Sequence, residues 1–187
     1  MPRGALRYRL VSTAAGPVGY VCSPRGLVGV RIGHARQGRL RAAIVAQWPG
    51  RIREDARLLP ELAAGLRAYF DGRPVSFDGI ELDDSLGTAF QRRVWRACAR
   101  VRWGQTITYG ELARLVGSPG AARAVGSALG RNPRPIIVPC HRVLAADGRL
   151  GGFSAPGGCD LKRKLLALEG HAGTSSGLLH KAQAPVE

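Results

Sequence analysis

Residues 136–143, Ile-Ile-Val-Pro-Cys-His-Arg-Val, decide how the rest of this chain is interpreted. The apolar start predicts a buried extended segment, and Pro139 can continue neither a helix nor a central strand. The chain therefore bends where a thiol, an imidazole and a guanidinium follow one another, in Cys140, His141 and Arg142. Cys140 is either an inert buried cysteine, with its two neighbours facing solvent, or a reactive thiol in a built site. The surrounding sequence must distinguish the two.

The composition is that of a globular protein with 187 residues, 45% of them apolar. No apolar run is long enough to span a membrane and no signal peptide is evident, so we expect a soluble, cytoplasmic protein without membrane contact. The four cysteines lie far apart without a CxxC pair, which favours free thiols and gives a metal site little support.

Positive charge is the strongest global signal, because the net charge is +15 and its distribution is uneven. Residues 1–86 hold 13 Arg against 8 Asp and Glu, whereas residues 87–170 hold 14 Arg and Lys against 4 acids. The excess lies in the half that contains Cys140. Nucleic acid is the natural partner, because neutralised phosphates release condensed counterions. Nearly all these cations are arginine, which coding bias also explains, so charge alone leaves nucleic-acid binding undecided.

The first half predicts short strands followed by helices. Three β-like runs with short turns between them predict an antiparallel meander, at residues 6–12, 18–22 and 27–32. Helices are expected over about 36–47 and from Pro60, with Tyr69 in the apolar stripe of the second. Residues 75–82 are expected to be extended, and the polar stretch 83–87 is a plausible domain boundary.

Helical periodicity dominates after that boundary, beginning with a helix over about 88–99. Thr108 and Glu111 predict a capping box for the next helix, because each side chain can bond the backbone N–H of the other. A second helix over 121–129 follows closely, and Ser118-Pro119 is expected to cap it. This spacing is typical of a helix-turn-helix, although any small bundle has the same pattern.

The second of these helices is slim, because small residues fill most positions and Arg123 is its only charge. A helix that reads the major groove projects several long polar side chains toward the bases, and this one does not. A thin helix with one long cation suits close approach in a minor groove. Tight packing against another helix fits equally well. Trp95 and Trp103 are expected to pack in the core rather than stack on bases.

A turn, a loop and a closing helix flank the reactive stretch. Asn132 lies in a proline-rich turn, which its side chain can hold by bonding nearby backbone. Residues 151–158 are too rich in glycine for regular structure and can form one wall of a pocket. Asp160 is expected to cap a last helix that ends near Glu169, and residues 171–187 are expected to be disordered.

The stretch Pro139-Cys140-His141-Arg142-Val143 resembles the O6-alkylguanine-DNA alkyltransferases, or methylated-DNA–protein-cysteine methyltransferases. Further motifs agree with the family in the same order: residues 87–91 (GTAFQ), 108–113 (TYGELA), 121–126 (AARAVG), 132–133 (NP) and 161–170, with Lys162 and Glu169. The resemblance covers about residues 87–170. The N-terminal half resembles the family only in its pattern of strands and helices.

The family resemblance implies an α+β fold. An N-terminal domain, residues 1–86, has a small antiparallel sheet with helices. A helical C-terminal domain, residues 87–170, carries a winged helix-turn-helix-like DNA-binding motif and the active-site cysteine. The implied partner is double-stranded DNA with an alkylated guanine, bound through the minor groove, and no cofactor is implied. We expect a monomer and leave cooperative binding on DNA open.

By analogy with the family, the damaged nucleotide is flipped out of the duplex, since a stacked base cannot reach a thiol inside a pocket. Arg123 then takes the place of the base, and Tyr109 helps to drive and receive the nucleotide. The Tyr109 hydroxyl, carbonyls near Cys140 and Val143, and the backbone N–H of Ser154 would bond the guanine. Further substrate or DNA contacts are expected from Ala122, Gly126 and Arg142.

Alkyl transfer to Cys140 is a displacement at carbon that requires the thiolate. In the family pattern Glu169 orients His141, which takes the thiol proton through a water, while Asn132 supports the turn. The leaving guanine takes a proton from Tyr109 or a linked water. The thioether product is stable and no second residue is available to cleave it, so we expect one reaction per molecule.

Some features depart from the family pattern. The loop 154–158 is longer than the common form. Members that bind zinc use Cys and His ligands in the N-terminal domain; Cys22 matches one ligand position and the others hold no ligand, so we predict no metal. Two other functions compete, a non-catalytic DNA-damage binding protein and a cysteine hydrolase. Damage sensors related to the family lack the cysteine, so Cys140 argues against the first.

Overall fold

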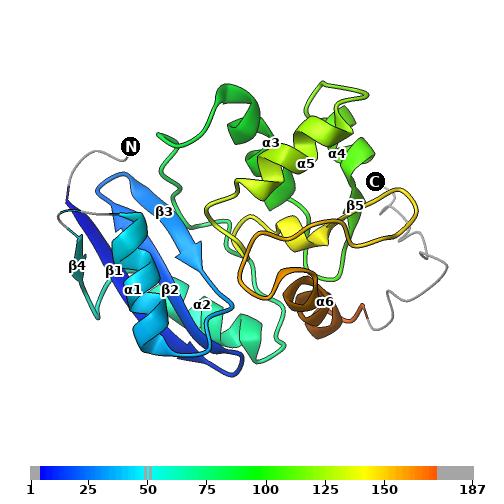
Figure 1. Cartoon of the computed structure of the whole chain (residues 1–187). Coiled ribbons are helices and arrows are strands. Elements are labelled where there is room, and N and C mark those ends of the chain that lie inside the picture. Colours follow the sequence, from blue (N-terminus) through cyan, green and yellow to red (C-terminus); the bar gives the residue numbers. More distant parts are fainter. Residues whose placement is uncertain (1–4, 49, 51, 172–187) are drawn as a thin grey trace.

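Strands β1 (Leu6–Thr13), β2 (Gly16–Ser23) and β3 (Gly26–Arg31) form the antiparallel meander that the sequence predicts (Figure 1). A fourth strand, β4 (Ile52–Glu54), was not expected from the sequence; it pairs in parallel with β1 and makes the sheet order β3-β2-β1-β4. Three residues are too few to show a strand alternation. The computed structural model describes residues 5–48, 50 and 52–171.

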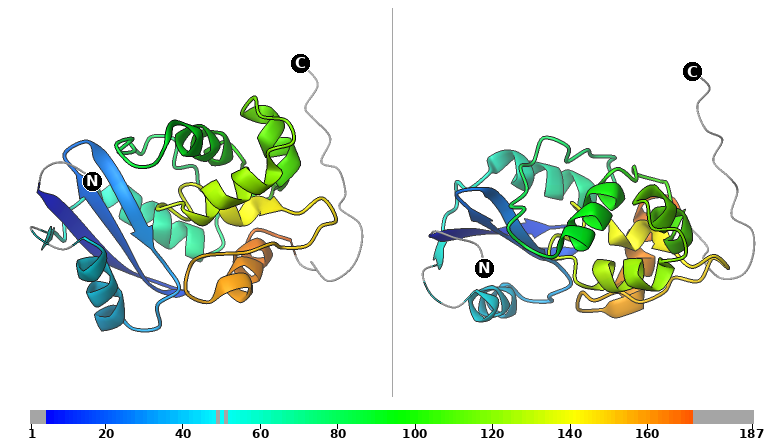
Figure 2. Two further views of the ribbon diagram at one scale, coloured as in Figure 1. Left: turned by 45° about the horizontal axis from the view of Figure 1, so that its top comes forward. Right: turned by 90° about the horizontal axis from the view of Figure 1, so that it is seen from above.

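Helices α1 (Gln37–Gln47) and α2 (Pro60–Phe70) cover opposite faces of this sheet (Figure 2). Only Leu40 and Ile44 of α1 are buried, so that helix closes a small core. Helix α2 buries five residues in a larger core, to which Ile136 and Leu165 from the second half also belong. The α2 face of the sheet is therefore the face on which the two halves of the chain meet.

The second half is helical, as expected, and the α+β fold class is confirmed. Helices α3 (Ala89–Ala99), α4 (Tyr109–Leu115) and α5 (Ala122–Gly130) pack on one another around a second core. Trp95 lies in that core, and Trp103 packs against the edge of Tyr69 in the first one.

Two helices begin with a capping box, one of them expected from the sequence. Thr108 and Glu111 bond each other's backbone N–H at 2.8 and 3.1 Å, as predicted, and Thr88 and Gln91 do the same at the start of α3. The prediction that Ser118-Pro119 caps α5 is wrong. The Ser118 N–H instead bonds the Ala113 carbonyl and closes α4, so α5 begins three residues after Pro119.

Two segments expected to be extended are not strands. Residues 136–138 are buried, but Ile136 has a φ of +74° and the Val138 N–H bonds the Arg134 carbonyl at 2.8 Å, so this segment is a tight turn. Residues 75–82 are irregular apart from a bridge between Leu82 and Leu27. In both segments the apolar residues indicate burial, and a buried turn has the same apolar composition as a buried strand.

Helix α6 (Gly158–Leu168) closes the described chain. Asp160 lies in its first turn and pairs with Arg163, whereas the capping position belongs to Gly157, so the predicted cap is wrong. Among the helices that the structure describes, none is both long and apolar enough to cross a bilayer. Apart from His171, the tail predicted to be disordered lies outside the described residues, and the predicted boundary at 83–87 stays a prediction.

Gly33 makes the sharpest backbone contact between the halves. Its φ is +80°, and a Cβ there would lie 2.2 Å from the Pro156 carbonyl oxygen. We expect Gly33→Ala to lower the free energy of unfolding by roughly 2–5 kcal/mol, since it adds both backbone strain and overpacking. The control Gly38→Ala, at a site in α1 where the described chain leaves space, should be neutral or stabilising by up to about 1 kcal/mol.

Urea unfolding of both variants measures this difference. Equal stability of the two variants would show that the loop around Pro156 moves away without resistance.

Candidate active site

Cys140 begins a single 3-10 turn, η1 (Cys140–Arg142), which Pro139 separates from the buried turn 136–138. The Cys140 side chain is 7% exposed, His141 0% and Arg142 6%. The interpretation in which His141 and Arg142 face solvent is therefore wrong. A tight turn also separates neighbouring side chains, so Cys140 and His141 bond different partners.

Asn132 holds the thiol and the turn together. Its side-chain amide donates to the Val138 carbonyl at 2.8 Å and to the Cys140 sulfur at 3.3 Å. Its oxygen accepts the backbone N–H of Arg134 at 3.0 Å, so every polar atom of the Asn132 side chain is used. The sequence-based expectation that Asn132 bonds the nearby backbone is confirmed.

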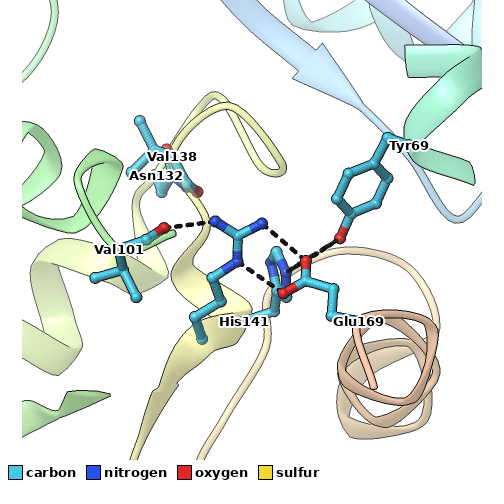
Figure 3. A network of polar contacts seen from close by, with 7 residues as sticks. Tyr69, Val101, Asn132, Val138, His141 and Glu169 are labelled. Atoms are coloured by element: carbon cyan, nitrogen blue, oxygen red, sulfur yellow. Dashed lines mark hydrogen bonds and ion pairs between the residues drawn. The ribbon is translucent and has the colours of Figure 1, made fainter. Parts of the chain in front are cut away.

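His141, Arg142 and Glu169 form a buried network that Tyr69 completes (Figure 3). The imidazole Nε2 lies 2.8 Å from Glu169 Oε1. Arg142 binds both carboxylate oxygens, at 2.8 and 2.9 Å, and donates to the Val101 carbonyl at 2.5 Å. The Tyr69 hydroxyl donates to Glu169 Oε1 at 2.6 Å. A single carboxylate therefore accepts four hydrogen bonds.

This network identifies the histidine tautomer. An ionised carboxylate can only accept, so Nε2 of His141 must carry the proton that points at Glu169. In the neutral ring Nδ1 is then the basic nitrogen. Nδ1 is buried, and the described part of the chain offers it no hydrogen-bond partner. His141 can therefore take up a proton at Nδ1.

The pKa shifts have separate causes. Burial would raise the pKa of Glu169, but hydrogen bonds from His141 and Arg142 outweigh it and bring that pKa to about 2. Burial lowers the pKa of His141. Burial also raises the pKa of the Cys140 thiol, although the Asn132 bond and the nearby Lys162 charge work against that rise. At neutral pH the site therefore holds a thiol beside a neutral imidazole, and the thiolate has to be generated by proton transfer.

A cavity of about 750 Å³ opens beside Cys140. Its wall contains several of the site residues expected from the family resemblance, namely Tyr109, Ala122, Arg123, Gly126 and Ser154. The two-residue strands β5 (Ile107–Thr108) and β6 (Val143–Leu144) pair in parallel and bring Tyr109 next to η1. The Tyr109 ring lies between Gly126 and Gly151, and a Cβ at Gly151 would come within 2.7 Å of its hydroxyl oxygen.

The structure does not bring Val143 or Arg142 to the described wall of this cavity. Val143 is buried, and its carbonyl accepts from Lys162 Nζ at 2.7 Å. The guanidinium of Arg142 is enclosed by Glu169 and Val101, so the expected contact of Arg142 with DNA conflicts with its position.

Two functional candidates were not assigned a role from the sequence. Tyr69 was placed in an apolar stripe, and its hydroxyl partner lies 100 residues away. Lys162 is fully buried and also bonds the Leu150 carbonyl, which fixes the start of the glycine-rich loop. A buried phenol or ammonium always requires a partner, but no sequence spacing names it. In the ranges that the structure describes no three His, Cys, Asp or Glu residues cluster as metal ligands, and the prediction of no zinc stays a prediction.

Glu169→Gln tests the electrostatics of this network. The pKa of Glu169 is depressed in the folded state, so its contribution to stability is complete above its unfolded pKa of about 4.3 and is lost as pH falls toward 2. The variant leaves Arg142 buried without its counter-charge, which should cost about 3–5 kcal/mol at neutral pH. Its free energy of unfolding should also fall less steeply with acid than that of the wild type.

Urea unfolding at a series of pH values measures both effects. Asp160→Asn, which removes an exposed carboxylate, is the control and should keep the wild-type acid dependence. An unchanged pH slope for Glu169→Gln would contradict the depressed pKa.

Known proteins resemble this chain over most of its length. Residues 89–171 match the family model of the 6-O-methylguanine DNA methyltransferase, DNA binding domain. A methylated-DNA–protein-cysteine methyltransferase of Methanosarcina acetivorans is 39% identical over 87% of this chain and 97% of its own length. A methylated-DNA–protein-cysteine methyltransferase of Mycolicibacterium paratuberculosis is 53% identical over 62% of this chain and 68% of its own length. The crystal structure of Mycobacterium tuberculosis OGT in complex with DNA matches with a TM-score of 0.71 at 39% identity, covering 87% of this chain and 92% of that one.

Proposed function

The chain belongs to the methylated-DNA–protein-cysteine methyltransferases, which repair DNA by alkyl transfer, and we propose that its own acceptor is Cys140. The observation that carries this proposal is the position of the thiol. Cys140 lines a cavity, accepts a hydrogen bond from Asn132 and is directly followed by a histidine whose free Nδ1 can accept a proton. The substrate is O6-alkylguanine in double-stranded DNA.

Base flipping follows from the depth of the thiol. Because Cys140 is only 7% exposed, a guanine that stays stacked in a duplex cannot bring its O6 substituent to the sulfur. The cavity beside the thiol has a volume of about 750 Å³, which offers room for a rotated base, and Tyr109 and Ser154 lie in its wall. Arg123 is exposed on slim helix α5 and fills the vacated place in the stack as α5 enters the minor groove.

The transfer step begins with the thiol proton. It passes through a water to Nδ1 of His141, and Glu169 stabilises the imidazolium that forms. The thiolate of Cys140 attacks the alkyl carbon, so that an S–C bond forms while the bond from carbon to O6 breaks. Guanine leaves with the electron pair and takes a proton from Tyr109 or a linked water. Burial raises the pKa of Tyr109, so its phenol holds a proton at neutral pH.

Two buried cations, Lys162 and Arg142, support this chemistry without contacting the guanine. The ammonium of Lys162 holds the Val143 and Leu150 carbonyls, and its charge favours the thiolate of Cys140. Burial lowers the pKa of Lys162 to about 8, so the group remains mostly charged at neutral pH. Arg142 binds the carboxylate of Glu169 and holds it in place. This role takes the place of the DNA contact that the family resemblance implied for Arg142.

The competing functions differ in stoichiometry. A thioether at Cys140 has no residue nearby in this proposal that removes it, so the protein reacts once. A cysteine hydrolase would turn over, and a damage-binding protein would transfer nothing.

Treatment with O6-benzylguanine should add one benzyl group per molecule and then stop, and peptide digestion should find the group on Cys140. Cys140→Ser should abolish the mass increase yet retain affinity for DNA containing O6-methylguanine, because the serine hydroxyl is far less nucleophilic. Intact-mass spectrometry and a DNA-binding titration measure the two quantities. Continued product release beyond one equivalent would favour the hydrolase, and a modified Cys140→Ser protein would overturn the assignment of Cys140.

Arg123→Ala should slow repair of duplex DNA more than reaction with the free base, because only the duplex needs its stack filled. We expect a loss of roughly 1–3 kcal/mol in transition-state stabilisation on duplex DNA, the range of a base-stacking contact. Arg67→Ala is the control, since Arg67 is exposed on α2 and does not belong to the described wall of the cavity beside Cys140. Equal losses with duplex DNA and free base would contradict the role of Arg123.

A further inference from the structure

Tyr69 reaches the site from the other half of the molecule. It lies on α2, which packs on the N-terminal sheet, and its side chain is 0% exposed. The ring meets Phe70 and Trp103 edge-on, each with a centroid distance of 5.1 Å. Its hydroxyl oxygen lies 2.6 Å from Glu169 Oε1 and 3.2 Å from His141 Nε2. The phenol is thus fixed by aromatic packing and aimed at the carboxylate.

The direction of this hydrogen bond follows from the groups involved. Burial strongly raises the pKa of Tyr69, so the phenol keeps its proton and must donate it to the carboxylate. In the described chain the donors to Glu169 are Arg142, His141 and Tyr69, and of these Tyr69 alone precedes residue 87. The carboxylate oxygen that receives the Tyr69 proton is the same one that orients His141.

We propose that Tyr69 is a positioning residue for alkyl transfer, through which the N-terminal half completes the active site. Its hydroxyl fixes the Glu169 carboxylate, and the carboxylate fixes the imidazole of His141 with Nδ1 free to act as base. The inference rests on the proposed transfer to Cys140. The N-terminal half then takes part in the chemistry through Tyr69 on α2, besides stabilising the fold.

The same contact sets the proton affinity of the base. His141 faces Lys162 from α6 and Glu169 from the cap of that helix, Arg142 and Cys140 from its own turn, and Tyr69 from α2. Tyr69 draws part of the carboxylate charge toward itself. Without that hydroxyl, Glu169 attracts an imidazolium more strongly, and the pKa of His141 rises.

Tyr69→Phe keeps the aromatic ring and removes only the hydroxyl. We expect the rate constant for benzyl transfer from free O6-benzylguanine at neutral pH to fall about tenfold, a fraction of what a general base contributes. The midpoint of the acid limb of the pH–rate profile should move to a higher pH by roughly half a unit, because His141 and the coupled Glu169 stay protonated up to a higher pH. DNA affinity should not change.

Tyr20→Phe is the matched control. Tyr20 is equally buried in the same core, and its single hydroxyl proton is shared between the carbonyls of Leu58 at 2.5 Å and Leu59 at 2.9 Å. This variant also loses buried hydrogen bonds, yet it should keep the wild-type rate and pH profile. If Tyr69→Phe and Tyr20→Phe give the same rate and the same acid midpoint, Tyr69 is a core residue only and the proposal is overturned.

A second substitution keeps the test decisive if Tyr69→Phe folds poorly. Site-specific 3-fluorotyrosine at position 69 retains the hydroxyl and makes it a stronger donor, so the acid midpoint should move down rather than up. A midpoint that stays at the wild-type value overturns the proposal. If the wild type itself transfers no benzyl group to Cys140, the proposed function fails and the role of Tyr69 falls with it.

Discussion

One buried carboxylate, that of Glu169, holds the active half of this protein together. It accepts four hydrogen bonds, two from Arg142 and one each from His141 and Tyr69. A charge removed from water is costly unless such partners are complete. Tyr69 comes from α2, and His141 and Arg142 come from η1; Arg142 also donates to the Val101 carbonyl just beyond the end of α3. The arrangement of these donors is therefore defined only when both halves of the chain are folded.

The turn that carries the thiol depends on the same docking. The Val30 N–H in β3 bonds the Pro133 carbonyl at 2.9 Å. The guanidinium of Arg134, 1% exposed, donates to the carbonyls of Leu27 and Asp83 and lies over the Trp95 ring. Arg134 also joins the turn to Asn132 through its backbone. Contacts with the N-terminal half therefore help to fix the positions of the Cys140 thiol and of Asn132, its hydrogen-bond donor.

Local signals were predictable from the sequence and contacts between distant residues were not. The meander and the Thr108–Glu111 box depend on neighbours within a few residues, so their patterns are visible in the sequence. The family motifs located Cys140, His141 and Glu169. The role of Tyr69 was missed because its hydroxyl bonds Glu169, which lies far along the chain. Residues 136–138 were wrongly expected to be extended, because apolar side chains indicate burial and not the backbone angle φ.

A raised thiol pKa looks unfavourable for a nucleophile, but it suits a protein that, as proposed, reacts once. A permanent thiolate in Cys140 would react with any small electrophile or oxidant, and each such event would consume one molecule. Burial keeps Cys140 a thiol and His141 a neutral imidazole. In the proposed mechanism His141 takes the proton when the sulfur attacks a bound alkyl carbon. The low pKa of Glu169 keeps its charge available for that moment at every physiological pH. Selectivity for a bound alkyl group then follows from the resting protonation states as well as from the shape of the cavity.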